Sequence, residues 1–239
     1  MPESPTYSKG FFETLREGSM RSAQVIAPIV LDFIHIKSIV DVGCGTGEFL
    51  KTFREYGVQD ILGIDGEYID PDLLAIPQEN FLALDMSIPF SLDKNYSLAL
   101  CLEVAEHLPP ESARGFVESL TQLAPIILFS AAIPLQGGTH HVNEQWPGYW
   151  VDLFGMRGFV PVDAIRKRIW KASQVEWWYR QNILFFCDEQ ILSANPKLEK
   201  EFHTTNVNML SLVHPELYRR IQSQLIHYWK ILHSSAQKD

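Results

Sequence analysis

The chain has 239 residues, three cysteines and a formal net charge of −9, from 29 acidic and 20 basic residues. This acidic excess argues against a nucleic-acid backbone as the main partner, because phosphate binding relies on clustered Lys and Arg. No apolar stretch approaches the ~18 residues of a membrane helix, and the N-terminus lacks the basic and apolar segments of a secretion signal. The cysteines show no metal-ligand spacing, so the sequence predicts a cytoplasmic protein with a single α/β fold and some additions.

Two helices are expected before the first strand. Residues 11–17 and 20–34 carry apolar side chains at helical spacing. Pro28 is expected to bend or interrupt the second helix, because proline removes a helix hydrogen bond. Residues 1–36 are therefore predicted to form an N-terminal helical cap.

A turn with three glycines separates the first strand from the next helix. The apolar run Ile36–Val40 predicts the strand, and residues 47–56 predict the helix. Gly43, Gly45 and Gly47 tolerate positive φ and carry no Cβ, so a ligand can approach the main chain and the amides at the helix N-terminus. This arrangement predicts a nucleotide-cofactor site.

The spacing of these glycines separates two kinds of cofactor. A dinucleotide-binding turn has the pattern Gly-x-Gly-x-x-Gly, in which the third glycine lets the helix pack close beneath a pyrophosphate. Here Gly47 comes one residue early, and Glu48 holds the dinucleotide position. A carboxylate is a poor neighbour for a pyrophosphate but is tolerated beside a cofactor with a cationic amino group. The turn disfavours a nicotinamide-dependent dehydrogenase, which stays as an alternative.

Two further predicted strands end in acidic residues. Residues 61–64 lead to Asp65, and residues 81–84 lead to Asp85 and Met86. Open α/β sheets bind ligands at the carboxyl ends of their strands, where an acidic residue can accept hydrogen bonds from both ribose hydroxyls. Asp is also common in ordinary turns, so neither aspartate is decisive by itself.

Between about Ile36 and Ala132, four segments resemble, in the correct order, the motifs of the class I S-adenosylmethionine-dependent methyltransferases. They are the glycine turn with its preceding acid, the ends of the next two strands, and Tyr96–Pro109. The resemblance implies S-adenosylmethionine as cofactor, with Asp65 at the ribose and Asp85 at the adenine amino group. The residues that it implies at the cofactor are Asp41, Gly43, Cys44, Gly45, Gly47, Asp65, Gly66, Asp85, Met86, Leu102 and Glu103.

The remaining elements are those expected of this fold. Helices are predicted at 70–76 and 111–123, and strands at 126–130, 158–160 and 182–187. The expected fold class is α/β: a Rossmann-like three-layer sandwich with a seven-stranded, mostly parallel sheet and one antiparallel strand.

The expected division of the chain follows from these elements. Residues 37–187 form the methyltransferase core, with a substrate-loop insertion at about 133–157. Residues 188–239 form a helical extension, which includes a predicted helix at 215–233.

The loop Ala132–Trp150 leaves the carboxyl end of the fifth strand, where loops commonly carry chemistry. Its sequence resembles a Gly-Gly-Thr-x-His-x-Asn-Glu-Gln-Trp-Pro-x-Tyr-Trp block of bacterial methyltransferases found alongside glycan or natural-product biosynthesis. The resemblance implies a small-molecule, glycan or natural-product acceptor. The residues expected to bind the acceptor are His140, Trp146, Tyr149, Trp150 and Arg180.

An alcohol acceptor needs a base, and two histidines are candidates. His141 is the first choice and His107 the second, with Glu144 able to orient either imidazole. A plainer interpretation of His141 is that it caps a helix starting at Asn143. No metal is expected, because no group of carboxylates is left over from the cofactor site and the adjacent His140 and His141 point apart in an extended loop.

Three later features have a structural and a functional interpretation. Trp177 and Trp178 lie either beside the cleft or in the core, and Arg180 either anchors an acidic substrate or is an exposed rim charge. The basic cluster 166–168, with Lys171, is interpreted as a helix face.

The favoured function is an S-adenosylmethionine-dependent methyltransferase that acts on a hydroxyl group. Transfer to a carboxylate or to nitrogen is the alternative within this class. A catalytically inactive adenosylmethionine-binding partner module is the alternative of another class, and it predicts cofactor binding without methyl transfer.

Overall fold

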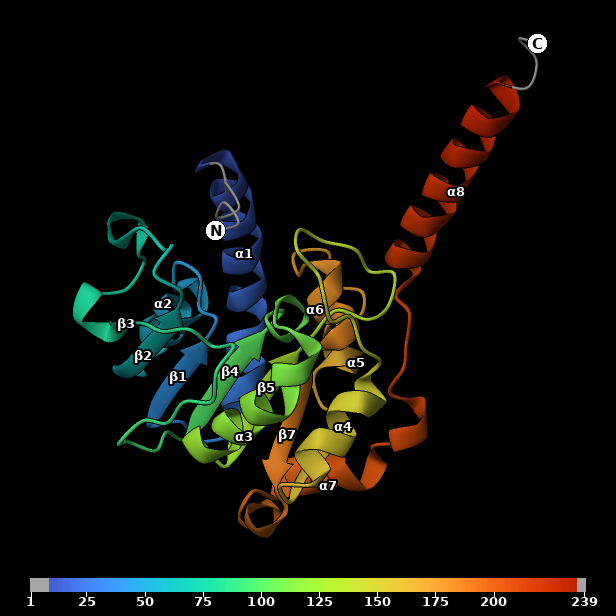
Figure 1. The fold of residues 1–239 in the computed structure, drawn as a ribbon. Helices are drawn as coiled ribbons and strands as arrows, with labels where there is room; N and C mark the ends of the chain where they lie inside the picture. The colour runs from blue at the N-terminus through green and yellow to red at the C-terminus, as the bar shows by residue number, and fades with distance from the viewer. Residues whose placement is uncertain (1–8, 236–239) are drawn as a thin grey trace.

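The fold is given by a computed structural model, which describes residues 9–235 and the side chains of residues 16–233. Residues 1–8 of the predicted N-terminal cap and residues 236–239 of the predicted extension lie outside this range. Figure 1 shows a central sheet with helices on both sides and one long helix that leaves the body near the C-terminus. The domain boundaries expected from the sequence stay a prediction.

The sheet has seven strands in the order β3-β2-β1-β4-β5-β7-β6. Only β7 runs antiparallel to its neighbours, β5 and β6, among the strands of this sheet. This confirms the predicted sheet with one antiparallel strand. The strands are β1 (Ser38–Val42), β2 (Asp60–Asp65), β3 (Phe81–Ala83), β4 (Leu98–Leu102), β5 (Ile126–Ser130), β6 (Phe159–Val162) and β7 (Leu184–Asp188).

Helices cover both faces of the sheet because its central strands are apolar on both sides. Along β1, Ile39 packs into one core cluster with α1 and α2, whereas Val40 and Val42 pack into a second cluster with α3 and α4. The helices are α1 (Lys9–Phe33), α2 (Glu48–Glu55), α3 (Ala113–Leu123), α4 (Pro147–Gly155), α5 (Arg166–Ile169), α6 (Trp177–Asn182), α7 (Pro196–Thr204) and α8 (Pro215–Ser235).

Three local predictions differ from the structure. Helix α1 is a single helix that runs through Pro28 to Phe33. The helix predicted at 70–76 is only a 3₁₀ turn, Pro71–Leu73, because Leu74 is already extended and Pro77 follows. Asn143 does not start a helix; α4 starts at Pro147, whose missing N–H and fixed φ suit the first helical position.

The basic cluster after β6 lies on helix α5, where Lys167 and Arg168 are exposed, as a helix face predicts, but Arg166 is buried. The Arg166 side chain is 1% exposed, and its Nε and Nη2 lie 3.0 and 2.6 Å from the two carboxylate oxygens of Asp163. Its Nη1 donates to the backbone carbonyls of Gln181 at 3.1 Å and Leu210 at 2.7 Å. Arg166 therefore joins the end of β6 to α6 and to the chain that leads into α8.

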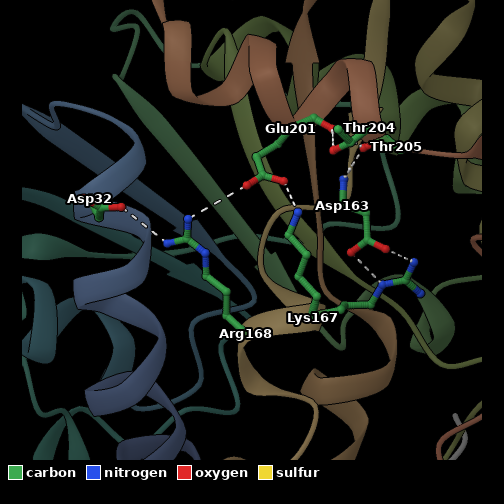
Figure 2. Close-up of polar contacts among 8 residues, drawn as sticks. Asp32, Asp163, Lys167, Arg168, Glu201, Thr204 and Thr205 are labelled. Carbon is green, nitrogen blue, oxygen red and sulfur yellow. Dashed lines mark hydrogen bonds and ion pairs between the residues drawn. The ribbon is translucent and has the colours of Figure 1, made fainter.

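Two further cations of this cluster, Lys167 and Arg168, connect α5 to α7 and α1. Lys167 and Arg168 both reach the carboxylate of Glu201 on α7 (Figure 2). Arg168 also lies 3.3 Å from Asp32 near the end of α1. These contacts connect segments that lie far apart in the sequence.

Helix α8 projects from the body as an arm (Figure 1). Its exposed apolar side chains include Tyr218, Leu225, Ile226, Tyr228, Trp229, Ile231 and Leu232. Within residues 9–235, none of the helices combines the length and the apolar character needed to cross a bilayer.

Candidate active site

A cleft of about 1390 Å³ lies at the carboxyl edge of the parallel strands. Its walls come from the ends of β1, β2, β3 and β4, from the loop after β5, and from residues of α1, α6 and α8. This is the edge at which open α/β sheets bind ligands, so the topology places the predicted motifs around one cavity.

The glycine turn after β1 has the backbone that the sequence predicts. Gly43, Gly45 and Gly47 have φ of +82°, +55° and +89°. The Gly43 and Cys44 amides donate to the carbonyl of Ile64 on β2 at 2.8 and 3.0 Å. A Cβ on Gly43 would lie 2.2 Å from a Val104 methyl carbon, so only glycine fits there.

Asp65, the last residue of β2, is a hydrogen-bond acceptor for this turn. Its carboxylate accepts from the amides of Gly45 and Gly66, each at 2.7 Å, and from the hydroxyl of Tyr68. Burial raises the pKa of Asp65, and these three donors act in the opposite direction. The side chain borders the cleft and is held in one orientation by its donors.

Two more buried carboxyl groups border the same end of the cleft. Burial raises the pKa of Asp41 to about 7, and the nearby Asp65 and Glu48 carboxylates add to this effect. Glu48 accepts from the Thr46 hydroxyl at 2.7 and 2.8 Å and from Arg16 Nε at 2.8 Å. This excess of buried negative charge fits a cofactor that carries a cationic amino group.

Asp85 and Met86 follow β3 and also line the cleft. The amide and the hydroxyl of Ser87 donate to Asp85 Oδ1 at 2.9 and 2.6 Å, which lowers the pKa of the carboxyl group. Met86 is buried beside it. An ionised acceptor next to an apolar side chain suits the edge and the face of an adenine ring.

The predicted cofactor residues lie together, with one exception. Gly47 caps the N-terminus of α2 and does not line the cleft; a Cβ there would press on Ile76. The others that line the cleft are Asp41, Gly43, Cys44, Gly45, Asp65, Gly66, Asp85, Met86, Leu102 and Glu103.

The predicted histidines line the same cleft, in the part that we call the acceptor end. The rings of His107 and His141 meet edge to face with centroids 4.8 Å apart. Glu144 Oε1 lies 2.9 Å from His141 Nδ1, and the Glu144 carboxylate also accepts from the amides of Leu135 and Gly137 at 2.8 and 2.7 Å. Glu144 therefore lies behind His141 and fixes the loop that carries it.

Burial shapes the chemistry of the residues beside these rings. Partial desolvation of the ring lowers the pKa of His107 to about 4, although more than a third of the residue is exposed, and the neighbouring His141 contributes to the shift. The Glu106 side chain is fully buried, and neither of its oxygens has a hydrogen-bond partner among the described residues. Burial raises the pKa of Glu106 well above its usual range, and the nearby Glu103 carboxylate raises it further.

Glu103 belongs to a buried polar network that the sequence did not reveal. Its carboxylate accepts from Asn182 at 3.1 Å and from Gln136 at 2.7 Å. Gln136 in turn accepts from Asn182 at 2.9 Å and from Gln181 at 3.1 Å. This network ties the end of β4 to the loop after β5 and to α6.

The backbone is strained around the same site. Glu103, Leu135 and His140 have φ of +56°, +69° and +59°, a region that non-glycine residues rarely adopt. All three line the cleft. Such conformations cost of order 1–3 kcal/mol each and cluster at functional sites, where the surrounding structure holds them.

Several residues predicted to bind the acceptor do not reach the cleft. Trp150 is 2% exposed and packs on Phe129 in the core, with ring centroids 5.2 Å apart. Tyr149 packs edge to face against Trp150, and Trp146 is 43% exposed outside the cleft. The apolar face of α4 turns Trp150, with Tyr149 packed against it, toward the sheet, whereas Trp146 precedes the helix and stays exposed. His140 does line the cleft.

Arg180 is neither a substrate anchor in the cleft nor an exposed rim charge. It is 9% exposed, and its Nη2 donates to Glu216 at the start of α8 at 2.9 Å. The contact holds the first turn of α8 against the body.

One wall of the cleft, which the sequence did not predict in full, consists of aromatic residues of α6 and residues of α8. Trp177 and Trp178 border the cleft, as one of the two interpretations expected, and Tyr179 does so as well. Arg220 lies over the Trp177 ring, 5.6 Å from its centroid. The wall formed by α8 consists of Leu217, Arg220, Ile221 and Gln224. No short motif marks these four residues, because they meet the cleft only through the path of the chain between α7 and α8.

Comparisons with known proteins agree with the fold and the motifs. No curated protein matches the chain significantly in sequence. The structure is similar to magnesium protoporphyrin IX methyltransferase from Synechocystis PCC 6803 with bound SAH, at a TM-score of 0.53 and 20% identity over 78% of this chain and 90% of that one. The same enzyme with bound SAM gives a TM-score of 0.51 and 21% identity, over 76% of this chain and 86% of that one.

A second solved structure is a SAM-dependent methyltransferase from Archaeoglobus fulgidus. It has a TM-score of 0.50 and 22% identity over 64% of this chain and 74% of that one. At these identities the likeness concerns the fold. The sequence model of a family described as "Methyltransferase domain" matches residues 16–172, which is more than half of the chain. The chain therefore belongs to this family of class I methyltransferases, and its cofactor is S-adenosylmethionine.

Proposed function

We propose that the protein transfers the methyl group of S-adenosylmethionine to a hydroxyl oxygen of a small-molecule, glycan or natural-product acceptor. The observation that carries the proposal is that one cleft is lined both by the glycine turn and Asp65 and by His107 and His141. Methyl transfer needs close approach of donor and acceptor, alignment, and an acceptor without its proton. The cleft supplies residues suited to each of these tasks.

The residues near the glycine turn would hold the cofactor. Asp65 suits the ribose hydroxyls, Asp85 suits the adenine amino group, and the carboxyl group of Asp41 suits a cationic amino group. The cofactor supplies a methyl group on a positively charged sulfur, which is a good electrophile. The remaining task of the protein is to present an oxygen nucleophile to that group.

At the acceptor end, His141 is the residue expected to remove the hydroxyl proton. Glu144 supports this role, because its carboxylate holds Nδ1 and leaves the other ring nitrogen to accept a proton. His107 is less suited, since a pKa lowered to about 4 makes its ring a weak proton acceptor. The two histidines therefore have unequal roles in the proposal.

The aromatic part of the cleft wall suits an acceptor with a ring. Half-buried Trp178 offers flat apolar surface with a polar edge, as sugars and aromatic natural products require, whereas Trp177 is buried with Arg220 over its ring. Ile221 and Arg220 of α8 extend this wall. The mixed character of the wall supports a small amphipathic acceptor more than an extended polymer.

The first experiment is calorimetric titration of the purified protein with adenosylmethionine, its demethylated product and NAD, with Asp65→Ala as the control variant. Micromolar binding of the first two ligands alone is expected. The second experiment supplies adenosylmethionine with a ¹³C-methyl group to panels of hydroxylated, amino and carboxylic acceptors and locates the label by NMR. Label on oxygen of a hydroxyl supports the proposal, whereas label on nitrogen or a carboxylate identifies the alternative acceptors. Cofactor binding without transfer to any panel would point to an inactive partner module.

A further inference from the structure

Glu106 is the most unusual side chain of the acceptor end. It is fully buried, and neither carboxylate oxygen has a hydrogen-bond partner among residues 16–233. Its backbone carbonyl accepts from the amides of Val142 and Asn143 at 2.8 and 3.0 Å, and its carboxyl group lies near the Ala132 backbone and the Glu103 carboxylate. Removing a carboxylate from water without a partner costs several kcal/mol, so a native protein supplies a proton, a hydrogen-bond donor or a cation at such a position.

Two imidazoles stand beside this carboxylate. One donor atom each of Glu106, His107 and His141 can be chosen such that all three lie within 4.8 Å of one another. Neighbouring ligands of one metal ion at ~2.0–2.2 Å lie about 3–3.6 Å apart. Side-chain movements of about an ångström would therefore bring all three into a common coordination shell.

The surroundings of His141 are those of a metal ligand. Glu144 lies 2.9 Å from Nδ1, and the amides of Leu135 and Gly137 hold its carboxylate in place. A carboxylate on one ring nitrogen fixes the tautomer and turns the lone pair of the other nitrogen toward a metal. The Nε2 atom of His141 is thereby left as a ligand.

We propose that Glu106, His107 and His141 bind one divalent transition-metal ion at the acceptor end of the cleft. Two imidazole nitrogens and one carboxylate oxygen suit Mn²⁺, Fe²⁺ or Zn²⁺ better than Mg²⁺ or Ca²⁺, which prefer oxygen ligands. All three residues line the cleft, so coordination positions remain for a molecule in it. The sequence predicted no metal, because His141 is 34 residues from His107 and only the fold brings them together.

The role of the ion rests on the proposed function. A hydroxyl oxygen that binds the ion becomes more acidic, so its O–H bond breaks and the proton passes to water. The oxygen then forms a bond to the methyl carbon, and the carbon–sulfur bond breaks with its electron pair remaining on sulfur. The balanced result is a methyl ether, the neutral thioether product and one proton. In this scheme coordination uses the Nε2 lone pair of His141, so the ion takes over the role that the proposed function gives to His141 as the base.

The test uses the full-length protein, stripped with a chelator and dialysed, and titrates it with Mn²⁺ while electron paramagnetic resonance reports the free ion. One Mn²⁺ per chain is expected, displaced by Zn²⁺. Glu106→Gln should weaken this site by at least tenfold, and Glu144→Gln by about 10–100-fold through the loss of the group that orients His141. Glu111→Gln, an exposed carboxylate in the loop that follows, removes the same charge and should leave Mn²⁺ binding unchanged.

Circular dichroism and binding of the demethylated cofactor product verify that each variant is folded. The inference is overturned if the wild-type protein binds no stoichiometric Mn²⁺ or Zn²⁺, or if Glu106→Gln binds them as well as the wild type does. A buried proton on Glu106 would then account for the orphaned carboxyl group. Full methyl transfer by stripped protein in excess chelator would remove the catalytic role and leave the proposed function intact. Metal binding without methyl transfer to any acceptor would leave the metal site intact and contradict the proposed function.

Discussion

The Nδ1 atom of His141 lies 2.9 Å from Oε1 of Glu144, three residues further along the same loop. Glu144 is itself held by the amides of Leu135 and Gly137. Backbone amides of the loop after β5 thus hold the Glu144 carboxylate, and this carboxylate orients the His141 imidazole. The orientation of His141 is set before any acceptor enters.

The first prediction concerns this imidazole. His141→Ala should reduce turnover by ~10²–10⁴-fold, whether the ring removes a proton or holds a cation, and should leave cofactor affinity nearly intact. Single-turnover kinetics with calorimetry of the demethylated product measures both quantities. Unchanged turnover would exclude His141 from the chemistry.

The second prediction separates the two aspartates of the cofactor end. Asp65→Ala should weaken adenosylmethionine and its demethylated product alike, by roughly 10- to 150-fold, because a buried charged acceptor contributes about 1.5–3 kcal/mol. Asp85→Ala should have a smaller effect, since its carboxylate is exposed and keeps solvent as an alternative partner. Calorimetry of both variants and of the double variant should show nearly additive losses. Wild-type affinity in Asp65→Ala would refute the ribose assignment.

The third prediction follows from the pKa of Asp41, which burial raises to about 7. Between the unfolded value and this folded value the native protein holds a proton that the unfolded chain has lost, so the Asp41 contribution to stability falls as pH rises through that window. A cationic amino group beside Asp41 would lower its pKa. Cofactor binding near pH 6 should therefore release about one proton, and binding at about pH 8.5 almost none. Calorimetry in two buffers of different ionisation enthalpy measures the release, which Asp41→Asn should abolish.

The fourth prediction compares two glycines with positive φ. Gly43→Ala adds a methyl group 2.2 Å from Val104 to an already unfavourable φ of +82°, so it should destabilise the protein by ~2–4 kcal/mol. Gly57→Ala, at a φ of +101° with open space around the new Cβ, should cause only the backbone strain of ~1–2 kcal/mol. Urea unfolding of both variants tests the difference. Equal losses would show that Val104 moves aside.

The fifth prediction concerns the buried cation of α5. Arg166→Ala leaves Asp163 and two backbone carbonyls without their donor, and breaking a buried pair in this way costs about 3–5 kcal/mol. Lys171→Ala, an exposed member of the same basic cluster, should change stability by less than about 0.5 kcal/mol. The urea concentrations at the unfolding midpoints of the two variants, compared with that of the wild type, measure the difference in stability. A similar small effect in both variants would mean that Arg166 contributes little beyond its packing.

The sequence predicted the parts of this protein that depend on local pattern. The strands around the glycine turn and the acidic residues at strand ends follow from apolar runs and turn residues, and the fold confirms them. The single antiparallel strand was implied by the family resemblance, and the structure confirms it as β7. Trp150 was expected in the cleft, but the register of α4 turns it into the core. The spacing of apolar residues and the amino-acid composition do not determine which face of a short helix packs against the sheet.

The acceptor end was less predictable because its contacts are made between distant segments. Glu106 and His107 precede α3, whereas His141 comes after β5, and only the parallel pairing of β4 and β5 brings the two loops together. The same holds for Asn182, which joins Glu103 from the end of α6. Residues that meet only in the folded protein show no characteristic spacing in the sequence, so they could not be predicted from it.

Helix α8 touches the cleft only through its first turns, with Leu217 and Gln224 at the limits of the contact. The glycine turn and the aspartates, by contrast, all precede residue 90. The glycine turn and the aspartates thus lie far along the chain from the part of the cleft wall that α8 supplies. On the proposed function, exchange of the helix from Pro215 onward would alter acceptor preference and leave the nucleotide-binding residues unchanged.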